Sequence, residues 1–171
     1  MKILILTILA LTSYASETYQ GFTGYWLKVN ATAYSPHDPL DGHYRATKGK
    51  WLHKTADGVT DVRTTPYGVA VPSKNGIPSI AYGTKIIIPD APNKIMKIDD
   101  TGAAIRRITK QTGVLTIDVR FKTTKAALKW VGHTGRREIK VFIVTGKAPR
   151  QRELINFDEL PLFYPIERIN D

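Results

Sequence analysis

Two acidic positions in the second half of the chain have the residue type and the setting for acid–base chemistry. Asp99 and Asp100 follow the β-type run 94–98, and Asp118 follows the run 114–117. Strands disfavour Asp and burial disfavours its charge, so a carboxylate at the end of a β-branched run needs specific partners. Where strands lead into loops, such carboxylates can face a groove and transfer a proton to a substrate.

Asp118 is well placed to act as an acid. An acid that works near neutral pH needs a raised pKa, which a second carboxylate or apolar walls provide. The neighbours of Asp118 are apolar: Ile117, Val119 and Phe121. A purely structural interpretation stays open. Residues 100–102 read Asp-Thr-Gly, which is typical of an Asx turn, and Asp118 can be a charge on an edge strand.

The elements that must position these carboxylates are predicted to be mostly strands. Residues 27–34 alternate apolar and polar side chains, as a half-buried strand does. Five further β-type runs are separated by Gly or Pro: 67–71, 84–88, 94–98, 114–119 and 138–145. One short helix is predicted from Thr123 or Thr124 to Gly132, because a hydroxyl can cap its start and glycine can end it. Six strands and one helix indicate a mainly β protein, a small closed barrel with irregular loops, the longest of them at 37–65.

The N-terminus predicts an exported protein. Lys2 and the apolar run 3–11 are typical of a secretory signal peptide, here residues 1–15, and the run is too short to span a bilayer. We expect residues 16–147 to form one domain and the proline-containing residues 148–171 to form a C-terminal extension. The sequence contains no Cys, which excludes a disulfide framework.

The net charge of +10 favours an anionic polymer as the partner. For an exported protein, cell wall is a better candidate than intracellular nucleic acid, and no aromatic–basic ladder for single strands is present. The four histidines show no spacing typical of metal ligands: His37, His43, His53 and His133. We therefore predict neither a metal site nor another cofactor.

Six short segments occur in the order expected of one known family. They are ATAYSP at 31–36, TADG at 55–58, YGVAV at 67–71, IPSIAYGTKIIIP at 77–89, DDTGAAI at 99–105 and TIDVRF at 116–121. Each motif is weak alone, but their shared order is fairly specific. Together they resemble the three-aspartate (3D) domain of stationary-phase survival proteins and of membrane-bound lytic transglycosylase A, over residues 29–144.

The resemblance implies a fold, an activity and a set of site residues. The fold is a six-stranded double-psi β-barrel, and the activity is that of an exported muralytic enzyme peripheral to the cell wall. Such enzymes cleave the MurNAc–GlcNAc linkage of peptidoglycan glycan strands without water and leave a 1,6-anhydro sugar. Asp118 would be the catalytic acid and Asp100 its supporting partner. Substrate-binding residues would be Thr32, Tyr34, Thr101 and Gly102.

Two departures from the family pattern bear on this expectation. An Asp usually follows the strand at 67–71, but residues 71–73 read Val-Pro-Ser, so one name-giving aspartate is absent. The stretch between Asp100 and Asp118 is also longer than the family's usual short hairpin, which predicts an insertion at 106–112 at the hairpin tip.

Three alternatives therefore stay open. An inverting glycoside hydrolase would need a second carboxylate as base, and Asp57, Asp61 and Asp99 are the candidates. A non-catalytic, expansin-like binder of cell-wall glycan would tolerate the missing aspartate and would use the positive charge. A structural or partner-binding role would be carried by the extension at 148–171.

Overall fold

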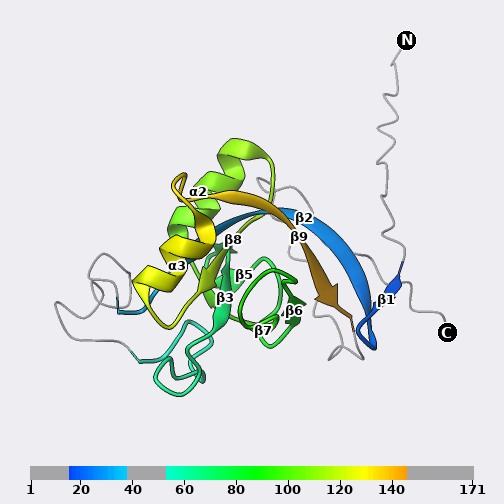
Figure 1. Cartoon of the computed structure of the whole chain (residues 1–171), viewed down its shortest axis with the longest axis horizontal. Coiled ribbons are helices and arrows are strands. Elements are labelled where there is room, and N and C mark those ends of the chain that lie inside the picture. Colours follow the sequence, from blue (N-terminus) through cyan, green and yellow to red (C-terminus); the bar gives the residue numbers. More distant parts are fainter. Residues whose placement is uncertain (1–15, 38–52, 146–171) are drawn as a thin grey trace, which may run out of the picture.

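The computed structural model describes residues 16–37 and 53–145 (Figure 1). Its elements follow in the order β1 (Glu17–Tyr19), β2 (Phe22–Tyr34), β3 (Gly68–Val71), β4 (Ser73–Lys74), β5 (Ile77–Pro78), β6 (Lys85–Ile87), β7 (Ile95–Thr101), α2 (Ala103–Thr112), β8 (Thr116–Arg120), α3 (Thr124–Val131) and β9 (Arg137–Val144). The expectations for residues 1–15 and 148–171, and for part of the loop at 37–65, lie outside the described residues.

Six strands close into a barrel. Hydrogen-bonded neighbours follow in the order β2, β8, β3, β7, β6 and β9, and β9 pairs again with β2. The pairs β2–β8 and β3–β7 are parallel, and the others are antiparallel. Each of the six predicted runs overlaps one barrel strand. The predicted mainly β barrel is therefore confirmed.

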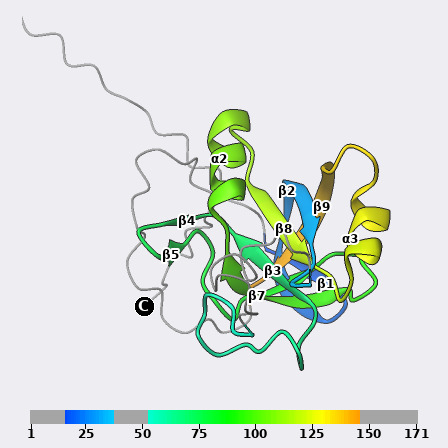
Figure 2. The ribbon, with the colours of Figure 1, turned by 90° about the vertical axis from the view of Figure 1, so that its left-hand side faces the viewer.

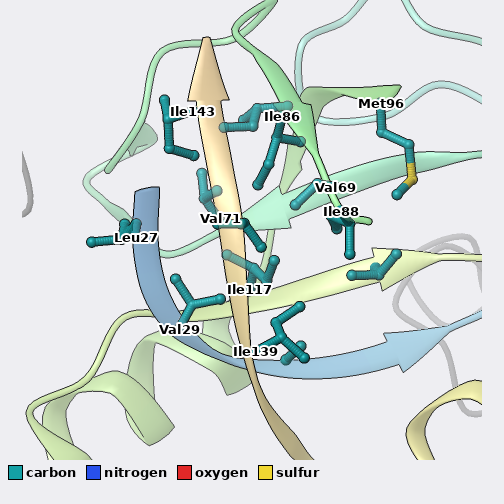
Figure 3. Packing of buried hydrophobic residues seen from close by; sticks show 14 of the residues in the cluster. Leu27, Val29, Val69, Val71, Ile86, Ile88, Met96, Ile117, Ile139 and Ile143 are labelled. Atoms are coloured by element: carbon teal, nitrogen blue, oxygen red, sulfur yellow. The ribbon is translucent and has the colours of Figure 1, made fainter. Parts of the chain in front are cut away.

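The inner face of the barrel is apolar because the strands alternate. Leu27, Val29 and Ala31 of β2 point inward, while the residues between them point outward. Figure 3 shows the inward side chains of neighbouring strands packed together, among them Val69 and Ile117. Burial of this apolar surface is the main favourable term for the fold. It also fixes the register, and with it the set of residues that face outward.

Two helices lie on either side of β2 and β8 in the described part (Figure 2). Helix α3 confirms the predicted helix: the Thr123 side chain accepts a hydrogen bond from Ala126 N, and Gly132 follows at φ 77°. Helix α2 occupies the stretch that was predicted to be an insertion at a hairpin tip. Its buried residues, Ile105 and Thr109, are four apart and share one face.

The strand pairing shows that three expectations about the surroundings of Asp100 and Asp118 are wrong. The prediction of a hairpin between Asp100 and Asp118 is wrong, because β3 lies between β7 and β8. The Asx-turn interpretation is wrong as well, since β7 continues through Asp99 and Asp100 to Thr101. Asp118 is not an edge charge, because β8 pairs with β2 on one side and with β3 on the other. Both acidic positions are therefore built into paired strands.

Candidate active site

The two predicted carboxylates lie in one row across four neighbouring strands. Asp100 of β7 is paired with Ala70 of β3, Ala70 with Asp118 of β8, and Asp118 with Thr32 of β2. Residues paired in this way project to the same face of a sheet, and neighbouring strands are about 5 Å apart. The adjacent residues on β3 and β8, Val69 and Val119, are core residues, so the row lies on the outer face of the barrel.

A break in the strand register brings a third aspartate to this face. Val69 pairs with Ile98 and Ala70 pairs with Asp100, so Asp99 is left over on β7 as the extra residue of a bulge. A bulge interrupts alternation and redirects a side chain. Asp99 and Asp100, although consecutive, therefore both reach the cluster around Tyr34 and Arg120.

Asp100 is buried and accepts hydrogen bonds from three donors. Its Oδ2 accepts from the Tyr34 hydroxyl at 2.9 Å, and its Oδ1 accepts from Thr101 N at 2.9 Å and from Ala56 N at 3.1 Å. The bond to Ala56 joins the TADG segment to β7, and Asp57 N adds a bond to the Asp99 carbonyl at 3.1 Å. Asp100 is thus held in place from β2, from β7 and from the loop at 55–60.

Asp118 is half-buried and has a different environment. Its Oδ1 accepts a hydrogen bond from Thr32 Oγ1 at 2.8 Å. The strand positions on either side of it, Ile117 and Val119, are fully buried in the core. The carboxyl group therefore stands on a rigid strand with part of its surface open to solvent, as a proton donor to a large substrate must.

A buried ion pair between Arg120 and Asp99 lies next to the row. Arg120 donates from Nη1 to Asp99 Oδ1 at 2.9 Å and from Nη2 to Asp99 Oδ2 at 2.6 Å, and both side chains are buried. Burial raises the pKa of Asp99, and the hydrogen bonds and charge of Arg120 offset part of this effect. Burial works against the charge of Arg120, yet the Tyr34 oxygen and Asp99 raise the arginine pKa above its ordinary value. Arg120 is therefore a permanent cation beside Tyr34.

Tyr34 connects the ion pair with the carboxylates. Its hydroxyl accepts from Arg120 Nη1 at 3.3 Å and donates to Asp100. Burial and then the charge of Asp100 raise the pKa of Tyr34 well above its usual value of 10, and the charge of Asp118 adds to this. Tyr34 is accordingly a neutral phenol at neutral pH.

The other candidate carboxylates are committed elsewhere. Asp57 accepts from Val59 N, from Thr60 N and Oγ1 and from Thr55 Oγ1. Burial is the largest single influence on its pKa and raises it, but these hydrogen bonds together lower the pKa overall. Asp61 is partly exposed and bound to Arg63, which lowers its pKa to about 2.

The structure brings together four of the six predicted site residues directly: Asp118, Asp100, Thr32 and Tyr34. Thr101 follows Asp100 and its side chain is hydrogen-bonded to Tyr82. Gly102 is the N-cap of α2, and its N–H bonds to the Val71 carbonyl at 3.3 Å. Substrate binding by Thr101 and Gly102 stays a prediction.

The sequence interpretation missed Arg120 and Tyr82 as members of the site, and it named Asp99 only as an acidic position and as a candidate base of a hydrolase, not as the partner of Arg120. Burial raises the pKa of Tyr82, as do the charges of Asp100 and Asp57, so this tyrosine lies within the field of the carboxylates. Arg120 had a usable signal, because it is two positions from Asp118 on one strand and must face the same side. The sequence contained no signal that Asp99 pairs with Arg120, because the direction of the Asp99 side chain depends on the bulge.

Pro72 directly follows β3, at the position where the resemblance to the three-aspartate domain leads us to expect an aspartate. Pro72 is buried, and its carbonyl accepts from Ser79 N at 2.7 Å. Arg106 of α2 donates to the Ser73 carbonyl at 3.3 Å. The chain here serves to join β3, the β4–β5 hairpin and α2.

Within residues 16–37 and 53–145, no three acidic or histidine side chains gather closely enough to hold a metal ion. Neither helix of the described part is long and apolar enough to cross a membrane. Comparison with protein-family models gives no match for this chain, and comparison with curated proteins gives none either.

Proposed function

We propose that this chain is an exported lytic transglycosylase with a 3D-type barrel that cleaves the MurNAc–GlcNAc linkage of peptidoglycan. The observation that carries the proposal is the row Asp100–Ala70–Asp118–Thr32 on the outer face of the barrel. It joins a half-buried carboxyl group on a rigid strand with a second, firmly held carboxylate two strands away. The six motifs of the family supply the substrate class.

In the proposed reaction, Asp118 is the single general acid and base. Its carboxyl group donates a proton to the glycosidic oxygen, and the bond between that oxygen and C1 of MurNAc breaks. The C6 hydroxyl of the same MurNAc attacks C1 and closes the 1,6-anhydro ring, and the Asp118 carboxylate takes up the hydroxyl proton. Proton and electron pairs balance, and no water is consumed. Thr32 orients Asp118, and Asp100 is its charged neighbour.

The hydrogen bonds and ion pairs of Asp57, Asp61 and Asp99 favour this reaction over inverting hydrolysis. A hydrolase of that type needs a free second carboxylate as base, roughly 6.5 to 9.5 Å from the acid. Asp57 is saturated by the hydrogen bonds of its turn, Asp61 is paired with Arg63, and Asp99 is paired with Arg120. An intramolecular nucleophile removes the need for such a base.

One observation favours a second candidate function, a non-catalytic glycan binder of the expansin type. The position of the missing aspartate is filled by buried Pro72, so this chain has fewer acidic groups at the site than the family pattern. The net charge of +10 suits binding to an anionic wall. In either case, we propose that glycan strands of peptidoglycan are the partner, that nucleic acid is not, and that the protein acts outside the cytoplasm at the cell wall.

Mass spectrometry of soluble products from purified peptidoglycan distinguishes these functions. The wild-type protein is expected to release muropeptides lighter by one water than hydrolytic fragments. Asp118→Asn keeps the shape but removes the proton, so we expect a loss of about 10²- to 10⁴-fold in rate. Asp61→Asn is the matched control and should retain the wild-type rate, because Asp61 is paired with Arg63 and does not belong to the row.

Each alternative has its own outcome in this experiment. Reducing-end products of ordinary mass would identify a hydrolase. Retention of both the wild-type protein and Asp118→Asn on peptidoglycan, with no products from either, would identify a binder.

A further inference from the structure

The buried ion pair between Arg120 and Asp99 has no role in the proposed reaction. Replacing a buried pair by apolar residues of similar size is often neutral or stabilising, because desolvation of both charges is costly. A contribution to stability therefore does not by itself explain why Arg120 and Asp99 form a buried ion pair here. Its position next to the row, where Arg120 contacts Tyr34 and Tyr34 contacts Asp100, indicates a further role.

The guanidinium of Arg120 is held on several sides. Besides Asp99, its Nη2 donates to the carbonyl oxygens of Thr65 at 3.2 Å and Tyr67 at 3.4 Å. Gly68 is the neighbour that leaves it room, since a Cβ atom there would lie 2.5 Å from Asp99 Oδ2 and closer still to Arg120. Arg120 thus cannot turn away without breaking several bonds.

This fixed cation determines the direction of the Tyr34 hydroxyl. A guanidinium has five donors and no acceptor, whereas a phenol has one donor. Because Arg120 Nη1 donates to Tyr34 Oη at 3.3 Å, the tyrosine cannot return its own proton to the arginine. The proton is directed instead to Asp100 Oδ2, at 2.9 Å.

We propose that Arg120 and Asp99 are positioning residues that fix the Tyr34 hydroxyl as a hydrogen-bond donor to Asp100, and so hold the Asp100 carboxyl group in place beside the strand that carries Asp118. This inference rests on the proposed function, in which Asp118 is the acid. The hydrogen bonds from Tyr34, Thr101 and Ala56 fix the orientation of the Asp100 carboxyl group, and the bond from Tyr34 is the one that depends on Arg120.

Ionisable groups near Tyr34, Asp100 and Tyr82 come from two strands and two loops of the described part. Strand β7 contributes Asp99 and β8 contributes Asp118 and Arg120, while the loop at 55–60 contributes Asp57 and the turn before β6 contributes Tyr82. Arg120 is the cation among those named. Its hydrogen bond to Tyr34 therefore determines that the tyrosine hydroxyl donates to Asp100.

Proton NMR tests the hydrogen bond without any reference to activity. A buried, hydrogen-bonded tyrosine hydroxyl exchanges slowly enough to give its own resonance, and Tyr34→Phe assigns it by its absence. We expect this resonance in the wild-type protein and in the control Tyr67→Phe, and we expect it to shift or disappear in Arg120→Lys. If Arg120→Lys does not fold, Asp99→Leu combined with Arg120→Met removes the pair without leaving an unpaired buried charge.

A kinetic experiment tests the consequence for Asp118. In Tyr34→Phe and in the variants of the pair, kcat should fall about tenfold with little change in KM. The shape of the kcat profile against pH should also change in these variants, because Asp100 then lacks the hydrogen bond that Tyr34 donates to it. Tyr67→Phe should leave the profile unchanged.

The two readouts separate the possible failures. A Tyr34 resonance that is missing in the wild-type protein, or unchanged when Arg120 is replaced, would overturn the proposed positioning. A loss of kcat that is equal at every pH would leave the pair a structural role and would also overturn it. If the wild-type protein releases no product, the proposed function fails, and the NMR result alone decides whether Arg120 orients Tyr34.

Discussion

At the scale of single residues, the outer face of β3 determines how closely the charged groups can gather. Gly68 and Ala70 are the two β3 residues on that face, and they lie opposite Arg120 and Asp118 on β8. A larger side chain at Gly68 would occupy the space that Arg120 and Asp99 use. Small residues on one strand therefore allow a polar cluster to form on its neighbours.

Gly68→Ala tests this requirement. The added methyl group would force Asp99 and Arg120 apart in a buried site, so we expect a loss of about 1–3 kcal/mol in the free energy of unfolding. Urea denaturation measures it. The same substitution in the background of Asp99→Leu with Arg120→Met provides the control, where its cost should change markedly. Equal costs in both backgrounds would mean that the ion pair is not what excludes the methyl group.

The pH dependence of stability tests the environment of Tyr34. Burial and the charge of Asp100 raise the pKa of this tyrosine in the folded protein above its unfolded value of 10. The proton therefore binds more tightly in the folded state, so its stabilising contribution is complete below pH 10 and is lost as the pH rises above 10.

Urea denaturation between pH 8 and 11 should show this loss in the wild-type protein. The decrease should be smaller in Tyr34→Phe than in Tyr67→Phe. A decrease of the same size in both variants would contradict the assigned environment.

At the scale of elements, helix α2 anchors the beginning of the strand that carries Asp118. Thr109 Oγ1 accepts the hydrogen bond of Thr116 N at 2.9 Å in a buried position, where β8 begins. At the other end of the helix, Gly102 N bonds to the Val71 carbonyl of β3. The helix thus joins two strands of the row.

Thr109→Val keeps the size of the side chain but leaves the N–H of Thr116 without its acceptor. An unsatisfied buried donor costs about 1–3 kcal/mol, which thermal or urea unfolding can measure. Gln111→Ala, on the exposed face of the same helix, is the control and should change stability little. A Thr109→Val protein as stable as the wild type would show that β8 does not depend on this bond.

The element scale also shows what the sequence could predict. Alternation in β2 and β-branched runs elsewhere were enough to locate all six barrel strands, since burial of one face imposes a period of two. Helix α2 was missed because Gly102 precedes it without a side-chain cap and its first turn has no acidic residue. Ile105, Thr109 and Thr112, spaced by four and three residues, were the available signal.

The arrangement of the site was harder to predict than its members. The family resemblance named Asp100, Asp118, Thr32 and Tyr34, but nothing local predicts that β3 separates the two aspartates. The bulge at Asp99 and the bond from Ala56 to Asp100 depend on contacts between segments far apart in the sequence. Such contacts are decided by tertiary packing, which propensity and spacing do not encode.

At the scale of the whole molecule, the closed barrel holds the carboxylates rigidly, and the net positive charge favours binding to anionic polymers. Every strand of the row is paired on both sides in the closed barrel, so the carboxylates are held on rigid elements rather than on loops. A positively charged protein is attracted to an anionic wall over long distances, and salt weakens this attraction. We expect retention on peptidoglycan to fall as ionic strength rises, while the position of the cut stays the same.

Digestion of peptidoglycan in water enriched in ¹⁸O tests the central claim most directly, because the proposed reaction uses the C6 hydroxyl of MurNAc in place of water. The products are analysed by mass spectrometry. The account predicts anhydro-muropeptides with no incorporated ¹⁸O, released by the wild-type protein and not by Asp118→Asn. One ¹⁸O atom per cleaved bond, at a reducing end, would contradict it and would show that a water molecule is the nucleophile.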